Sequence, residues 1–108
     1  MPCTATLDLV ALARAGVALA DPTRRHILAR LAEGPAYPGD LAAELDAAPA
    51  KVSNHLACLR GCGLVSATPD GRRVRYQLAT PALALALRQL AEAVVELGPC
   101  PSHLWPRQ

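Results

Sequence analysis

The order of elements between residues 38 and 79 constrains the fold of this chain more than any other feature. Residues 38–46 and 50–62 each place apolar side chains at helical spacing, and a short link joins them. Two alternating segments, 64–69 and 72–79, then flank Asp70-Gly71, which is a strong signal for a β-hairpin. Two short helices followed at once by a hairpin predict a winged helix-turn-helix.

Three further helices are expected, over residues 5–19, 22–33 and 81–97. Hydrophobic residues make up 52% of the chain, yet it contains no phenylalanine. The core must therefore be built from leucine, valine and alanine, and this composition favours a mainly α fold with one small β-hairpin. The segment 81–97 carries apolar residues on more than one side, so we expect it to pack against a partner subunit.

Basic side chains are concentrated in residues 51–75, which carry five of them and a single acidic residue. At about 100° per residue, Val52, Leu56 and Leu59 point inward from the second helix of the pair. Polar groups that suit base edges and phosphates then lie on the outer side, although each alone is also consistent with an ordinary solvated surface. The side chains expected to contact DNA are Lys51, Ser53, Asn54 and His55 on this helix, and Arg72, Arg73 and Arg75 on the hairpin.

The chain shows neither a signal peptide nor a membrane-spanning apolar run, so we expect a cytoplasmic protein. It has four cysteines, and in a reducing compartment these favour metal or redox chemistry over disulfides. We find no nucleophile–base pair and no phosphate-binding loop. The sequence therefore predicts neither an enzyme nor a protein with an organic cofactor.

Cys58 and Cys62 are four residues apart on a predicted helix, so their sulfurs should share one face. By the angular count they continue the outer stripe that begins with Lys51, Asn54 and His55. Two thiolates rarely hold a divalent ion alone, and Cys100, between two prolines, is the best candidate for a third donor, with Cys3 as an optional fourth. Thiolate ligands select soft ions such as Cd(II), Pb(II), Zn(II), Cu(I) or As(III).

Three segments together resemble the ArsR/SmtB repressor family: ALADPTRRHILARL (18–31), NHLACLRGCGLV (54–65) and DGRRVRYQL (70–78). The resemblance extends over about residues 5–97, and within the family it is strongest to the actinobacterial cadmium and lead sensors. It implies a homodimer held by its first and last helices and bound to operator DNA. We therefore expect a DNA-binding and dimerisation domain over 1–97, and a tail over 98–108 that carries a metal ligand and is irregular because it contains three prolines.

The resemblance further implies a repressor that leaves its operator when Cd(II) or Pb(II) binds the thiolates, with Cys100 coming from the other subunit. The residues themselves leave that origin open, as they do the choice among cadmium, lead and arsenic. An As(III)-responsive or thiol-redox-responsive repressor on the same fold is the main alternative. Two others are a structural zinc protein and a pair of cysteines that serve only as small buried side chains.

Overall fold

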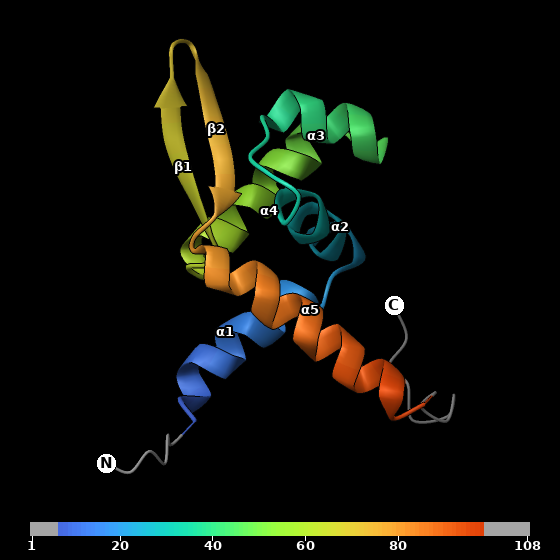
Figure 1. The fold of residues 1–108 in the computed structure, drawn as a ribbon. Coiled ribbons are helices and arrows are strands. Elements are labelled where there is room, and N and C mark those ends of the chain that lie inside the picture. Colours follow the sequence, from blue (N-terminus) through green and yellow to red (C-terminus); the bar gives the residue numbers. More distant parts are fainter. Residues whose placement is uncertain (1–6, 99–108) are drawn as a thin grey trace.

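The computed structural model describes residues 7–98, and its elements follow the predicted order (Figure 1). Cys3, Cys100 and nearly all of the expected tail lie outside the described residues. The elements are α1 (Leu9–Leu19), α2 (Pro22–Leu31), α3 (Pro38–Leu45), α4 (Pro49–Gly61), β1 (Val65–Asp70), β2 (Arg73–Leu78) and α5 (Pro81–Glu96). Their order confirms a mainly helical winged helix-turn-helix with one hairpin.

The helix starts are set by proline and aspartate. Proline occupies the first turn of α2, α3, α4 and α5, where its fixed φ suits the helix and its missing N–H costs no hydrogen bond. Asp21 accepts a hydrogen bond from the Arg24 amide at 3.0 Å, and Asp8 accepts one from the Ala11 amide at 3.0 Å. These carboxylates cap α2 and α1 and satisfy amides that have no partner inside the helix.

The hairpin turn lies one residue later than the sequence predicted. Asp70 is paired with Arg73 at the end of the ladder, so the two connecting residues are Gly71 and Arg72 instead of Asp70 and Gly71. Gly71 has a φ of 64°, as a tight two-residue turn with glycine in its first position requires. The wing formed by β1 and β2 projects away from the helices (Figure 1).

The core lies among α2, α3, α4 and the base of the wing, and it is aliphatic as composition predicted. α4 packs against α2, α3 and β1, and the wing is tied to the body through paired Ala36 and Tyr76. Apart from Ala18, every buried hydrophobic side chain of the described residues lies between positions 27 and 65. The largest fully buried side chains are Ile27, Leu28, Leu41, Val52, Leu56 and Leu59.

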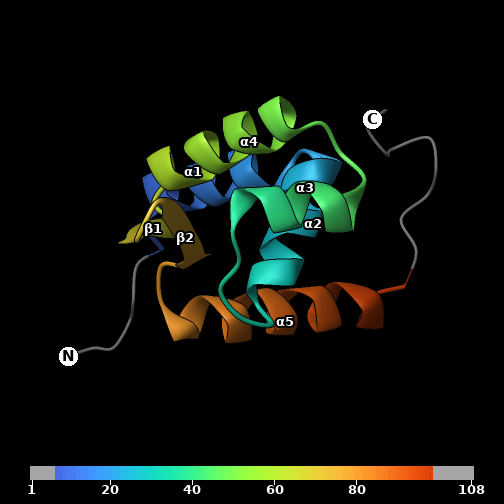
Figure 2. The same ribbon diagram turned by 90° about the horizontal axis from the view of Figure 1, so that it is seen from above.

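Helices α1 and α5, which we call the arms, extend from this body (Figures 1 and 2). α5 buries no side chain fully, and α1 buries only Ala18. Their apolar side chains are instead exposed, among them Leu9, Val10, Leu12 and Val17 on α1 and Leu85, Leu90, Val94 and Val95 on α5. Of the helices in the described range, none combines the length and apolar character needed to span a bilayer.

Candidate nucleic-acid interface and thiol pair

Helix α4 presents an exposed face near its N-terminus. Val52, Leu56 and Leu59 are fully buried, while Lys51, Ser53 and Asn54 are exposed, as the angular count predicted. The exposed face continues to Arg60, two turns beyond Ser53. Sequence reasoning did not name Arg60 as a contact, although its spacing of seven from Ser53 places it on the same side of the helix.

The structure places His55 differently from the sequence prediction. Its side chain is only 16% exposed, and its ring faces the start of α2. His55 Nε2 lies 3.6 Å from the Asp21 carboxylate, and His55 Nδ1 lies 3.4 Å from a guanidinium nitrogen of Arg24. The expected outer stripe therefore divides: Lys51 and Asn54 face solvent, whereas His55 packs against α2.

Arg73, on β2 of the wing, contacts two residues at the start of α3. Its guanidinium lies 3.6 Å from the centre of the Tyr37 ring and donates to the Asp40 carboxylate at 3.1 Å. The Tyr37 hydroxyl donates in turn to the Asp70 carboxylate, which raises the pKa of Tyr37. These contacts join the wing to the start of α3.

The other two predicted wing residues have surroundings that differ from those of Arg73, which is exposed but contacts Tyr37 and Asp40. Arg72 sits exposed at the tip of the turn, where a phosphate can reach it. Arg75 is half-buried, and its Nε has no hydrogen-bond partner among the described residues. The three arginines that looked equivalent in sequence therefore occupy three different environments.

Cys58 and Cys62 lie at the C-terminal end of α4, and both are free and half-buried. Cys62 is the residue that ends the helix, and its amide donates to the Cys58 carbonyl at 2.9 Å. The two side chains thus occupy successive turns of one face, as their spacing predicted. The two thiols continue the side of α4 that begins with Lys51 and Asn54, but they are half-buried where those two residues are exposed.

Cys62 opens toward the arms of the molecule. It lines a pocket of about 330 Å³ together with residues of α1 and α5, including Arg14, Leu83 and Leu90. Burial raises the pKa of the Cys62 thiol, and the neighbouring Cys58 raises it further. The charges of Arg24 and Arg14 act in the opposite direction. Burial and the neighbouring thiol thus outweigh the two cations, and the net shift of the Cys62 pKa is upward.

The described residues supply two thiol donors, and among positions 7–98 no three or more His, Cys, Asp or Glu side chains are grouped so that they could hold a metal ion. The nearest histidine along α4, His55, is turned to Asp21 and Arg24. A third thiolate would have to come from Cys3 or Cys100, both outside the described residues. Two free thiols on one helix face can supply some of the sulfur ligands that a soft metal ion prefers, but not a complete set.

A winged helix-turn-helix with an exposed polar face on its second helix defines a DNA-binding protein of the helix-turn-helix class. Comparison with known proteins narrows this class. Residues 21–67 match the family model described as "Bacterial regulatory protein, arsR family". The chain is also 57% identical over 93 residues to the HTH-type transcriptional regulator CmtR of Mycobacterium tuberculosis, a match that covers 83% of this chain and 79% of that one.

Solved structures agree with this placement. The cadmium metal-sensor CMTR from M. tuberculosis, solved by NMR, superposes with a TM-score of 0.65 at 60% identity, covering 76% of this chain and 85% of that one. A homodimeric winged helix-turn-helix DNA-binding domain from Mycobacterium bovis, a possible ArsR-family regulator, superposes with a TM-score of 0.72 at 27% identity over 91% and 98% of the two chains. The chain belongs to the arsR family of bacterial regulatory proteins, and it is a transcriptional regulator and not an enzyme.

Proposed function

We propose that this chain is a metal-responsive repressor that binds operator DNA as a homodimer and releases it when cysteine thiolates bind Cd(II) or Pb(II). The observation that carries the proposal is the pair of half-buried free thiols, Cys58 and Cys62, on the helix that presents Ser53 and Asn54. Sensing and DNA-binding groups thus share one rigid element. The similarity to a protein described as a cadmium metal-sensor supports the choice of ion.

Cys58, Cys62 and Cys100 would hold the metal, with Cys3 as an optional fourth donor. A soft divalent ion supplies strong bonds to sulfur that tie together parts of the chain otherwise joined only through the backbone. Burial of Cys62 and its raised pKa also bear on the redox alternative. Because the thiolate is both the nucleophile and the metal ligand, a raised pKa disfavours oxidation and metal capture alike, so metal–thiolate absorbance is the measurement that separates the two.

The DNA contacts that we propose come from the exposed N-terminal half of α4 and from the wing. Ser53 and Asn54 would meet base edges, while Lys51 and Arg72 would contact phosphates. Arg75 and Arg73 would contribute less directly, since Arg75 is half-buried and Arg73 is bound to Tyr37 and Asp40. His55 would act mainly through its packing against α2.

The homodimer is supported by the exposed apolar surfaces of α1 and α5. Side chains such as Leu9 and Val95 are 73% and 78% exposed in the single chain. Exposed apolar side chains in such number on two adjoining helices mark an interaction surface. A second copy of the chain is the occupant that we propose, and the homodimeric relative supports it. Residues 1–97 would then form the DNA-binding and dimerisation domain, and 98–108 the ligand-bearing tail.

Coupling between the two sites would follow from thermodynamic linkage. The thiol pair lies at the C-terminal end of α4, where Cys62 faces the arms, so metal capture there would change how α4 is placed relative to the dimer. A coupling free energy of about 1–3 kcal/mol corresponds to a change in operator affinity of about 5- to 150-fold.

The test is a metal titration of the reduced protein, followed by operator binding and by the ultraviolet absorbance of metal–thiolate bonds. The wild-type protein should bind Cd(II) with thiolate absorbance and lose affinity for its operator. Cys58→Ser, Cys62→Ser and Cys100→Ser should each bind DNA normally without metal but fail to release it. Wild-type protein whose operator affinity is unchanged by stoichiometric Cd(II) would refute the proposal.

A further inference from the structure

Arg24 bridges three elements, one of which, α4, carries the thiol pair. Its Nη2 donates to the Val17 carbonyl at 2.6 Å, and its Nε donates to the Ala18 carbonyl at 3.3 Å, both in the last turn of α1. Its Nη1 lies 3.4 Å from His55 Nδ1 on α4. One side chain of α2 therefore holds the end of an arm and the middle of the DNA-presenting helix.

His55 is engaged through both nitrogens of its ring. The Asp21 carboxylate lies 3.6 Å from Nε2, and it also accepts a hydrogen bond from the Arg24 amide at 3.0 Å. This arrangement lowers the pKa of Asp21, chiefly through the hydrogen bond from the Arg24 amide. The first turn of α2 thus holds α4 in place through His55, about one helical turn before Cys58.

The thiol pair lies further along the helix that Arg24 contacts. Cys58 follows His55 by three residues on α4, and Cys62, at the end of the helix, lines a pocket together with residues of both arms. A metal ion that joins these sulfurs to another part of the molecule therefore pulls on the same helix whose position Arg24 and His55 fix.

We propose that Arg24 is the positioning residue that couples metal binding at the thiol pair to the placement of α4, the DNA-presenting helix, against α1 and α2. This inference rests on the proposed function. Without metal, Arg24 holds α4 against the end of α1 through His55, Val17 and Ala18. Once a metal ion joins Cys58 and Cys62 to a further donor, α4 is displaced and the contact between His55 and Arg24 weakens.

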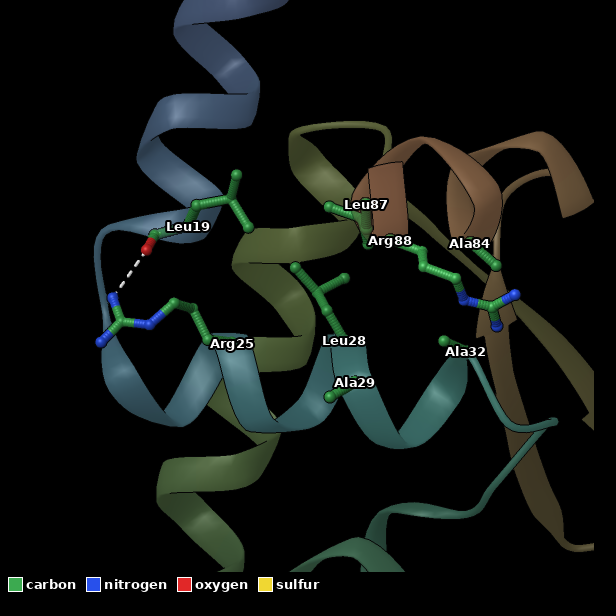
Figure 3. A pocket seen from close by; sticks show the side chains of 8 residues that line it. All are labelled: Leu19, Arg25, Leu28, Ala29, Ala32, Ala84, Leu87 and Arg88. Carbon is green, nitrogen blue, oxygen red and sulfur yellow. Dashed lines mark hydrogen bonds between the residues drawn. The ribbon is translucent and has the colours of Figure 1, made fainter. Parts of the chain in front are cut away.

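Arg25 offers a matched control on the same helix. Its Nη1 donates to the Leu19 carbonyl at 2.8 Å, so it also ties α2 to the last turn of α1 (Figure 3). It lines the pocket between α2 and α5, together with Leu28, Leu87 and Arg88 (Figure 3). Replacing Arg24 or Arg25 by glutamine removes one guanidinium and a tie to α1 in either case, but Arg24 is the one placed against His55.

The experiment compares Arg24→Gln, Arg25→Gln and wild-type full-length protein, all reduced. The DNA probe is a duplex that metal-free wild-type protein selects from a randomised pool, and the metal probe is cadmium chloride. The measured quantity is the ratio of operator Kd with and without Cd(II). We expect a wild-type ratio of about ten or more. Arg24→Gln should bind DNA more weakly without metal and show a ratio at least fivefold smaller, while Arg25→Gln keeps the wild-type ratio.

Metal binding is measured separately, by thiolate absorbance, because the inference concerns coupling and not capture. The Cd(II) stoichiometry of Arg24→Gln should equal that of wild type. His55→Leu gives a second variant if Arg24→Gln proves unfolded by circular dichroism, and it should also reduce the ratio. An unchanged ratio in a folded Arg24 or His55 variant overturns the inference, as does an equal loss in Arg25→Gln. A wild-type ratio of one would overturn the proposed function as well, so the two failures are distinguishable.

Discussion

The body of the molecule, residues 22–78, and the two arms bury their apolar side chains to very different extents. In the body, Leu56 and Leu59 are completely shielded from solvent, whereas Leu90 on α5 remains 53% exposed. The body therefore has its own core, whereas the arms leave much of their apolar surface exposed in the single chain. Cys62 lies at the boundary, with its backbone on α4 and its side chain in a pocket lined by both arms.

The largest expected effect comes from the core of the body. Leu56→Ala should lower the free energy of unfolding by about 2–5 kcal/mol, because it leaves a cavity among fully buried side chains. Leu90→Ala, measured at a protein concentration low enough to keep the chain monomeric, should change it by about 0.5 kcal/mol or less. Denaturant unfolding measures both, and similar losses in the two variants would contradict the division into body and arms.

A charged residue introduced on an arm should weaken dimerisation instead of lowering the stability of the single chain. Val94 is 54% exposed on α5, and Val94→Asp should weaken dimerisation at least about tenfold, because burying an unpaired carboxylate costs several kcal/mol. Sedimentation velocity over a range of concentrations measures the effect. Val74, 40% exposed on the wing, provides the control, and Val74→Asp should leave the dimer intact. A dimer unaffected by Val94→Asp would remove α5 from the interface.

The two aspartate caps give a smaller contrast. Asp21 caps α2 in the body and also lies near His55, while Asp8 caps α1 at an exposed position. Asp21→Ala should cost about 1 kcal/mol of stability at neutral pH, and Asp8→Ala less. Since the fold lowers the pKa of Asp21, its contribution is present above the ordinary value near 3.8 and is lost as pH falls through the lower folded value.

Unfolding free energies measured between pH 7 and pH 2 test this sign. The difference between wild type and Asp21→Ala should be constant down to about pH 4 and shrink below it. A difference that instead grows toward acid pH would mean that the carboxylate is not stabilised in its charged form.

The smallest expected effect separates two neighbouring wing residues. Arg72 is exposed at the turn, whereas Arg73 is bound to Tyr37 and Asp40. Arg72→Ala should reduce the slope of log K against log salt by about one, because one phosphate contact is lost. Arg73→Ala should weaken operator binding with little change in this slope. Equal slopes for Arg72→Ala and wild type would exclude Arg72 as a phosphate contact.

Local signals in the sequence predicted the fold well. Proline and aspartate at the helix starts, the 3.6-residue apolar period of α4 and the glycine of the turn each specify structure through neighbouring residues. The hairpin turn was misplaced by one position because Asp70 is held in the ladder opposite Arg73, while its side chain accepts from distant Tyr37. That contact spans 33 residues and leaves no local trace in the sequence.

The candidate site was predicted less completely, for the same reason. Helical spacing correctly placed Cys58 and Cys62 on one face and Ser53 and Asn54 on the surface. It did not predict that His55 turns toward Asp21 and Arg24, because that orientation depends on how α4 packs against α2. The bridging role of Arg24 likewise appears only once α1, α2 and α4 are assembled.

The central claim is that ion occupancy at the thiol pair and operator binding oppose each other. Linkage requires this opposition to be reciprocal, so the decisive measurement is the Cd(II) affinity of the reduced dimer, determined free and then saturated with operator DNA. We predict that DNA weakens Cd(II) binding by the same factor by which Cd(II) weakens DNA binding. Equal Cd(II) affinities in the two states would contradict the account.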